Sequence, residues 1–334
     1  MCVEDHPICV PRAVASHGIC AGIGPLSCVW VRIIARRYNY EGRQGFQVYP
    51  ESGSVHFGGQ WAVSYCDRIG RDLIRLEIKK LYEGVPAEIT RHWHKFAAEP
   101  PPDTSYEAVA ASRHVAGRAR ALTYGMANLA ENLAMLSDSM GMSPQAADTF
   151  FALRKEKLDY SGWWTFDAAE VVSRQIPRDM TLDTFLDRCL SLTKLLVEGL
   201  KEPPIRNIVR AAGVPEKDAK GYRTLKLLDC VVRLKQVAAA TGLFLKANDP
   251  TVWERLVADG TDPPQPIGHL FALYDLRLQK AHAGSKAAEI TKILARFGIN
   301  EGETAAGFGL VLDKVYDRLI DELNHVNKVL TGAL

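Results

Sequence analysis

The sequence predicts a mainly α-helical protein with a small antiparallel β region near its N-terminus. A period-two pattern of apolar residues is confined to about residues 45–80, and helical spacing dominates after that. Prolines and glycines then divide the chain into segments of single-helix length. Helices with one apolar stripe cannot bury it alone, so we expect a bundle.

The length, composition and net charge of the chain limit the classes of protein to which it can belong. The chain of 334 residues is long enough for two or three domains of about 100–200 residues each. Its composition, 47% hydrophobic and 24% charged, is that of a globular protein with a sizeable core. With 41 basic and 39 acidic residues the net charge is only +2, so nucleic-acid binding would need a local basic patch.

The cysteines and the N-terminal residues indicate the cellular compartment of the protein. Seven cysteines occur without a CxxC pair, a usage typical of a reducing cytosol. Four lie within residues 1–28, where a labile metal or redox cluster is the alternative to incidental cysteines. We expect residues 1–28 to be a disordered tail or to precede the true start. We predict a cytoplasmic protein without metal or cofactor.

The apolar segment near the N-terminus does not predict a membrane span. Its uncharged stretch before Arg32 is about 14 residues long, whereas a span needs about 20. Glu4 and Asp5 also make the extreme N-terminus acidic, unlike that of a targeting segment. We therefore predict no membrane partner.

Residues 29–100 form the predicted β-containing N-terminal region. The runs "SVHFGGQWAVSYC" and "RDLIRLEIKKL" flank the turn "DRIG", and apolar and charged residues alternate in the second run. This pattern predicts a hairpin that is part of a small antiparallel sheet. A short helix, "AEITRHWHKFA", follows and ends at "EPPPD". His92 and His94 point about 200° apart on that helix, so they do not predict a shared metal.

Residues 101–180 are predicted to be a helical linker region. A long amphipathic helix is expected from Ser105 to Met140. Ser143, as N-cap, and Pro144, in the first turn, predict another helix that continues to about Lys157. The tryptophans of "DYSGWWTFD" are expected to pack between helices rather than to stack on bases.

Residues 181–334 are predicted to form one helical bundle. Prolines and glycines mark most of the ends, and the last helix carries a continuous apolar stripe. The expected helices are 182–201, 216–241, 250–258, 267–281, 286–296 and 304–330.

One segment of this bundle is compatible with a helix-turn-helix DNA binder. Residues 207–228, "NIVRAAGVPEKDAKGYRTLKLL", have a helix, a Gly-Val turn and a second helix. Gly221 would interrupt that second helix, and acidic neighbours would oppose phosphates. The basic residues on it are Lys217, Lys220, Arg223 and Lys226.

The segment "LYDLRLQKAHAGS" carries the strongest functional signal. Arg277 and His282 are separated by four residues near the end of a predicted helix. This resembles the signature of the HEPN superfamily, helical bundles that bind nucleotides or cleave RNA, over residues 181–334 at most. The resemblance implies a HEPN-like bundle and a metal-independent endoribonuclease or RNA- or nucleotide-binding protein. It also implies toxin–antitoxin or phage-defence settings, with an antitoxin as partner. The family usually has a polar residue where this chain has Leu278.

The chemistry of RNA cleavage without metal assigns roles to the pair. A base must take the 2′-hydroxyl proton, an acid must protonate the leaving oxygen, and a cation must stabilise the phosphate charge. His282 suits the base or acid, and Arg277 suits the phosphate. One histidine and one arginine are too few, and the family pairs two protomers, which predicts a homodimer. His269 and Asp275 are expected to support the pair from the same helix.

Helix geometry adds a condition and leaves an alternative. Five residues along a helix leave two side chains about 140° apart, so Arg277 and His282 converge only if the helix ends first. The small residues that follow His282, "AGS", predict such an end. Alternatively, Arg277 pairs with an acid of a neighbouring helix and His282 caps the helix end. The protein would then be a non-catalytic scaffold or regulator that binds a protein partner.

Overall fold

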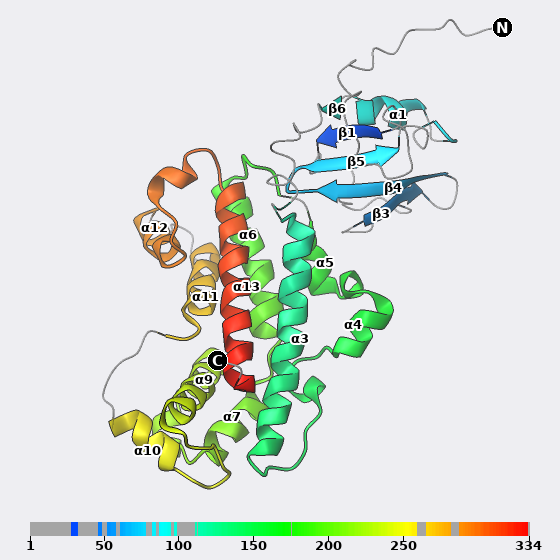
Figure 1. Ribbon diagram of the computed structural model, residues 1–334. Helices are drawn as coiled ribbons and strands as arrows, with labels where there is room; N and C mark the ends of the chain where they lie inside the picture. Colours follow the sequence, from blue (N-terminus) through cyan, green and yellow to red (C-terminus); the bar gives the residue numbers. More distant parts are fainter. Residues whose placement is uncertain are drawn as a thin grey trace, which may run out of the picture. The chain divides into compact units, whose positions relative to one another are not determined.

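The computed structural model divides the chain into two units (Figure 1). The first comprises residues 1–117 and 174–177, and the second comprises residues 118–173 and 178–334. The predicted boundaries at residues 100 and 181 do not coincide with this division. The structure describes residues 28–32, 46–48, 52–57, 61–77, 82–84, 87–94, 97–98, 111, 113–174, 176–258, 265–281 and 287–332.

The first unit contains an antiparallel sheet with strand order β2-β3-β4-β5-β1-β6. Strands β4 and β5 are joined by a tight turn in which Gly70 has a φ of +60°, a conformation that favours glycine. The elements are β1 (Cys28–Arg32), β2 (Phe46–Val48), β3 (Ser52–Phe57), β4 (Trp61–Ile69), β5 (Leu73–Glu77), α1 (Ala87–His94) and β6 (Ala97–Ala98).

The second unit is built from helices, and the described part of the chain is mainly helical, which confirms the prediction of a mainly α-helical protein. A π-helical turn, Lys194–Glu198, continues α6. The helices are α3 (Val115–Ser139), α4 (Lys155–Ser161), α5 (Asp167–Ser173), α6 (Leu182–Thr193), α7 (Glu202–Ala211), α8 (Glu216–Ala219), α9 (Thr224–Thr241), α10 (Thr251–Ala258), α11 (Gly268–Ala281), α12 (Ala287–Arg296) and α13 (Gly309–Thr331). Among the described helices, none is both long and apolar enough to cross a bilayer.

Helix α13 lies at the centre of the helical unit, with α3 on one side and α11 on the other (Figure 1). Asn132 of α3 donates a hydrogen bond to Asn327 of α13 at 2.8 Å, and Asn327 donates to the carbonyl of Gly125 at 3.0 Å. The apolar stripe predicted for the last helix is buried throughout. Its members are Val311, Val315, Leu319, Leu323, Val326 and Leu330.

The predicted helix from Ser143 to about Lys157 is wrong in extent. Only a 3-10 turn, Ala147–Thr149, forms before α4 begins at Lys155. Phe150 and Phe151 are fully buried, and Phe151 makes an antiparallel bridge with Leu200. Burial of this aromatic pair, with Phe151 held in a β-bridge, therefore outweighs the local helix-start signal.

Two of the expected helices are interrupted. The segment 182–201 is α-helical only to Thr193, and Pro203 and Pro204 lie in the first turn of α7 instead of only ending the preceding helix. The segment 216–241 is broken around Gly221 into a single turn, α8, and the longer α9. The second helix of the expected helix-turn-helix is therefore not continuous.

The tryptophans of the aromatic connection pack as expected. Trp163 is 2% exposed, and its ring meets that of Trp164 edge to face, with centroids 6.1 Å apart. The aromatic segment thus contributes to the core of the helical unit.

Candidate functional site on helix α11

Helix α11 carries the described residues of the predicted site and packs against α6, α12 and α13. The face of α11 that packs into the core is fully buried, so its position determines which way the polar side chains on the other faces of the helix point. That face consists of Leu270, Ala272, Leu273 and Leu276. The helix ends at Ala281, and His282 lies outside the described residues. The pairing of Arg277 with His282 therefore stays a prediction.

Arg277 points toward the end of the π-helical turn. Its Nη2 lies 2.8 Å from Oε1 of Glu198, and its guanidinium lies 5.4 Å from the centroid of the Tyr274 ring. The side chains of Arg277 and Glu198 are 32% and 42% exposed. Glu198 is the acid of a neighbouring helical segment that the scaffold hypothesis expects for Arg277.

Further acids face the last turn of α11. Lys280 Nζ lies 2.5 Å from Oδ1 of Asp183 and 3.0 Å from Oδ1 of Asp187, both on α6. The hydrogen bond to Asp183 is the largest cause of a raised pKa of Lys280, and the hydrogen bond to Asp187 is the next largest. The described surroundings of Arg277 thus carry both signs of charge and do not form a basic cleft.

The π-helical turn has a local cause in the sequence. Leu195, Leu196 and Val197 are consecutive and all buried. Successive residues of an α-helix point about 100° apart, so an ordinary turn would not easily bury all three against one neighbour. The wider π turn accommodates them and leaves Glu198 at the surface facing α11.

His269 lies at the other end of α11, in contact with a buried carboxylate. Its Nδ1 is 3.0 Å from Oε2 of Glu322, and its ring stacks on Phe297 with centroids 5.3 Å apart. Glu322 also accepts hydrogen bonds from the backbone N–H groups of His269 and Leu270, at 2.7 and 2.8 Å. The carboxylate therefore caps the positive end of the α11 dipole.

The structure does not bring the three described candidates together. His269 precedes Arg277 by eight residues, or about 12 Å along a helix axis. Asp275 faces α12, where its Oδ2 lies 2.5 Å from Nη1 of Arg296. His269 and Asp275 therefore hold α11 to α13 and α12, and neither contacts Arg277 through an ion pair.

A shallow depression lies between α11 and α12. Its volume is about 290 Å³, and Leu278, which is 36% exposed, forms part of its wall. The lining combines two apolar residues with polar and charged ones, namely Asp275, Leu278, Gln279, Glu289, Lys292, Ile293 and Arg296. Leu278 thus lies on a different face of α11 from Arg277.

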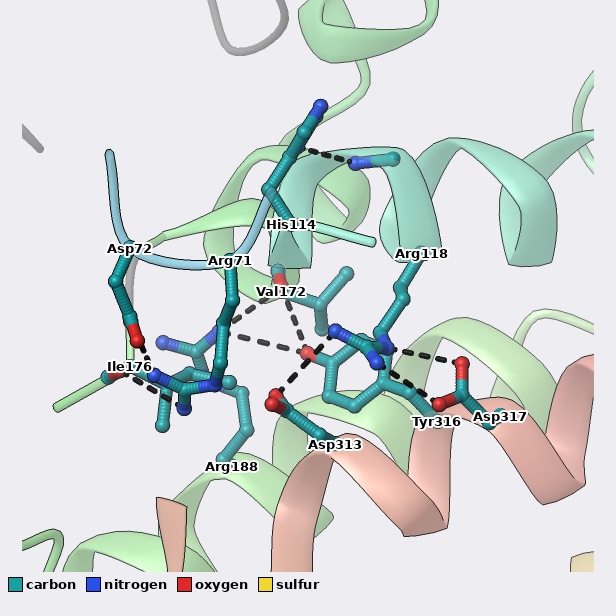
Figure 2. A network of polar contacts seen from close by, with 11 residues as sticks. Arg71, Asp72, His114, Arg118, Val172, Ile176, Arg188, Asp313, Tyr316 and Asp317 are labelled. Atoms are coloured by element: carbon teal, nitrogen blue, oxygen red, sulfur yellow. Dashed lines mark hydrogen bonds and ion pairs between the residues drawn. The ribbon is translucent and has the colours of Figure 1, made fainter. Parts of the chain in front are cut away.

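Sequence reasoning missed a polar cluster on α13 (Figure 2). Arg118 of α3 binds Asp317 with both Nε and Nη2, at 2.9 and 2.8 Å, and its Nη1 lies 3.6 Å from Asp313. Asp313 is almost fully buried. Polar residues at i, i+3 and i+4 beside an apolar stripe are the signal that marks this cluster in the sequence.

Tyr316 extends this cluster to α5 and α6. Its hydroxyl donates to the carbonyl of Val172 at 2.7 Å, and Arg188 donates to the same carbonyl at 2.9 Å (Figure 2). Burial of Tyr316 raises its pKa. Because Asp313 and Asp317 both face Arg118 of the same unit, we interpret this cluster as structural.

Comparison with protein-family models, curated proteins and solved structures found no match. Within the described residues, no group of three or more histidine, cysteine or acidic side chains is placed to hold a metal ion. The HEPN resemblance therefore rests on the sequence motif.

Proposed function

We propose that the helical unit binds RNA or a nucleotide through Arg277 near the C-terminal end of α11. The observation that carries this proposal is that the guanidinium of Arg277 is both oriented and accessible. It is oriented by Tyr274 and Glu198, while about a third of the side chain stays exposed. A guanidinium donates to carboxylate and phosphate oxygens through the same N–H groups, so a site arranged for one suits the other.

The enzymatic form of this proposal is a metal-independent endoribonuclease. Arg277 would stabilise charge on the phosphate, and His282 would move a proton as general base or acid. Two protomers would have to supply the two motifs, so the enzymatic form requires a homodimer. The HEPN resemblance supports this form and the toxin–antitoxin or phage-defence setting.

The test of the enzymatic form is RNA cleavage by purified protein in the presence of a chelator. We expect His282→Ala to abolish cleavage while the circular dichroism spectrum and the unfolding temperature stay unchanged. His325→Ala, which alters an exposed histidine of α13, is the matched control and should retain cleavage. Equal residual cleavage by the His282→Ala variant would show a contaminating nuclease and end the enzymatic proposal.

The second candidate is a non-catalytic helical scaffold or regulator that binds a protein partner. It is favoured by the ion pairs that join Arg277 and Asp275 to neighbouring segments, and by the contact of His269 with Glu322. If this candidate is correct, Arg277→Ala will lower the unfolding temperature slightly, and neither form of the protein will bind RNA.

A further inference from the structure

We propose that Glu198 is an internal substitute for phosphate. Its carboxylate occupies the anion position of Arg277, and a phosphate group of RNA or of a nucleotide must displace it to bind. This inference rests on the proposed function, because it concerns the same arginine. The inference identifies Glu198 as a residue that lowers the affinity of Arg277 for phosphate. It also implies that the anion position of Arg277 is occupied in the described form of the site.

The contact between Glu198 and Arg277 has the features of a displaceable pair. The Nη2-to-Oε1 distance of 2.8 Å is that of a charge-assisted hydrogen bond. Both side chains are nevertheless partly exposed, and ion pairs of this kind contribute little to the stability of a fold. The carboxylate can therefore leave the guanidinium without disturbing the core.

Tyr274 keeps the guanidinium in place when the carboxylate leaves. The centroid of its ring lies 5.4 Å from the guanidinium carbon, and both residues belong to α11. An arginine held over an aromatic ring loses less freedom when it binds an anion. The site is thus arranged for an anion whether or not Glu198 occupies it.

The position of Glu198 depends on an irregular backbone. It is the last residue of the π-helical turn, and such turns often occur at functional sites. The following residue, Gly199, could not carry a side chain without moving, because a Cβ there would lie 2.3 Å from the Phe151 ring. Phe151 is itself fully buried, so the core fixes the backbone beside Glu198.

The chain offers a matched control pair. Arg210 Nε lies 2.9 Å from Oε2 of Glu216, and these side chains are 51% and 58% exposed. Replacing Glu216 by glutamine removes the same charge from a similar surface pair that lies on other helices. The control also tests whether nucleic acid binds to the segment 207–228, because binding there would change when Glu216 is replaced.

The experiment measures binding of a fluorescently labelled 12-nucleotide oligouridylate by anisotropy. The proteins compared are wild type, Glu198→Gln, Glu216→Gln, Arg277→Ala and the double variant Glu198→Gln/Arg277→Ala. We expect Glu198→Gln to tighten binding about two- to five-fold, because the competing anion is removed. Glu216→Gln should bind like wild type, and the double variant should bind as weakly as Arg277→Ala.

Two results would overturn the inference alone. One is binding that depends on Arg277 but is equal for Glu198→Gln and Glu216→Gln. The other is a gain that persists in the double variant, because the effect would then not pass through Arg277. If wild type does not bind the RNA, or binds it independently of Arg277, the proposed function fails and the inference fails with it. Thermal unfolding of each variant shows that the fold is retained.

Discussion

Arg277 and His269 illustrate what single residues reveal in a sequence and what they conceal. The helix expected over residues 267–281 contains both, and the structure places them on α11. Their partners, Glu198 and Glu322, come from segments far along the chain, and no local pattern points to either. Residue types indicated the chemistry, but tertiary packing decided which groups meet.

The cap formed by Glu322 leads to a prediction of stability. Glu322→Ala removes the acceptor for two backbone N–H groups of α11, so we expect a loss of about 1–3 kcal/mol in the free energy of unfolding. Glu322→Gln retains an acceptor oxygen and should cost less. Urea denaturation measures both, with Asp321→Asn on the exposed side of α13 as control. A loss in the control equal to that of Glu322→Ala would contradict the assigned cap.

Tyr316 leads to a prediction at alkaline pH. Its pKa is raised by burial, so the folded state keeps the phenol neutral where the unfolded state ionises it. Stability from this group is present below its unfolded pKa of about 10 and is lost as pH rises toward the folded pKa. Tyr316→Phe should cost about 1 kcal/mol at pH 8, and should lose less stability than wild type between pH 8 and pH 10.5.

Urea denaturation at the two pH values checks the prediction for Tyr316. Part of the alkaline loss should remain in Tyr316→Phe, because burial also raises the pKa of Cys189, and raises that of Cys230 to about 12. An alkaline loss in Tyr316→Phe equal to that of wild type would show that Tyr316 does not contribute.

At the scale of elements, periodicity predicted the helices whose ends carry strong signals. Helices α10, α11 and α12 begin and end within a residue or two of the expected positions. The errors occur where packing opposes local preference. The buried side chains of Phe150 and Phe151 lie in an irregular segment where a helix was expected, and three consecutive buried residues widen the end of α6 into a π turn.

Gly199 provides a test at this scale. An alanine there would place its Cβ 2.3 Å from the Phe151 ring, so we expect Gly199→Ala to destabilise the protein by about 1–3 kcal/mol. Gly302→Ala is the control, because a Cβ at that position meets nothing within 4 Å. Thermal unfolding compares the two variants, and equal unfolding temperatures would contradict the assigned contact between Phe151 and the π turn.

At the scale of the whole molecule, the helical unit includes residues 118–173, which the sequence alone assigned to a linker. The reason is that α3 pairs with α13 through Asn132 and Asn327, a contact between distant parts of the chain. The amphipathic pattern predicted that α3 would be covered, but it could not identify the covering helix.

The enzymatic form of the proposed function predicts the assembly state. Two motifs must face one substrate, so we expect a homodimer at micromolar concentration. Sedimentation velocity measures the mass directly, and a single species of 36.9 kDa would contradict the enzymatic form. A monomer would not contradict RNA binding by Arg277, because binding does not require two motifs.

RNA binding by Arg277→Ala shows whether Arg277 binds phosphate. Arg210→Ala is the matched control, because Arg210 is also a partly exposed arginine paired with a glutamate. We expect Arg277→Ala to weaken binding of the labelled oligouridylate about ten-fold or more, the loss expected for a charged hydrogen bond to phosphate. Arg210→Ala should change it little. Equal binding by the two variants, or no binding by wild type, would contradict the claim.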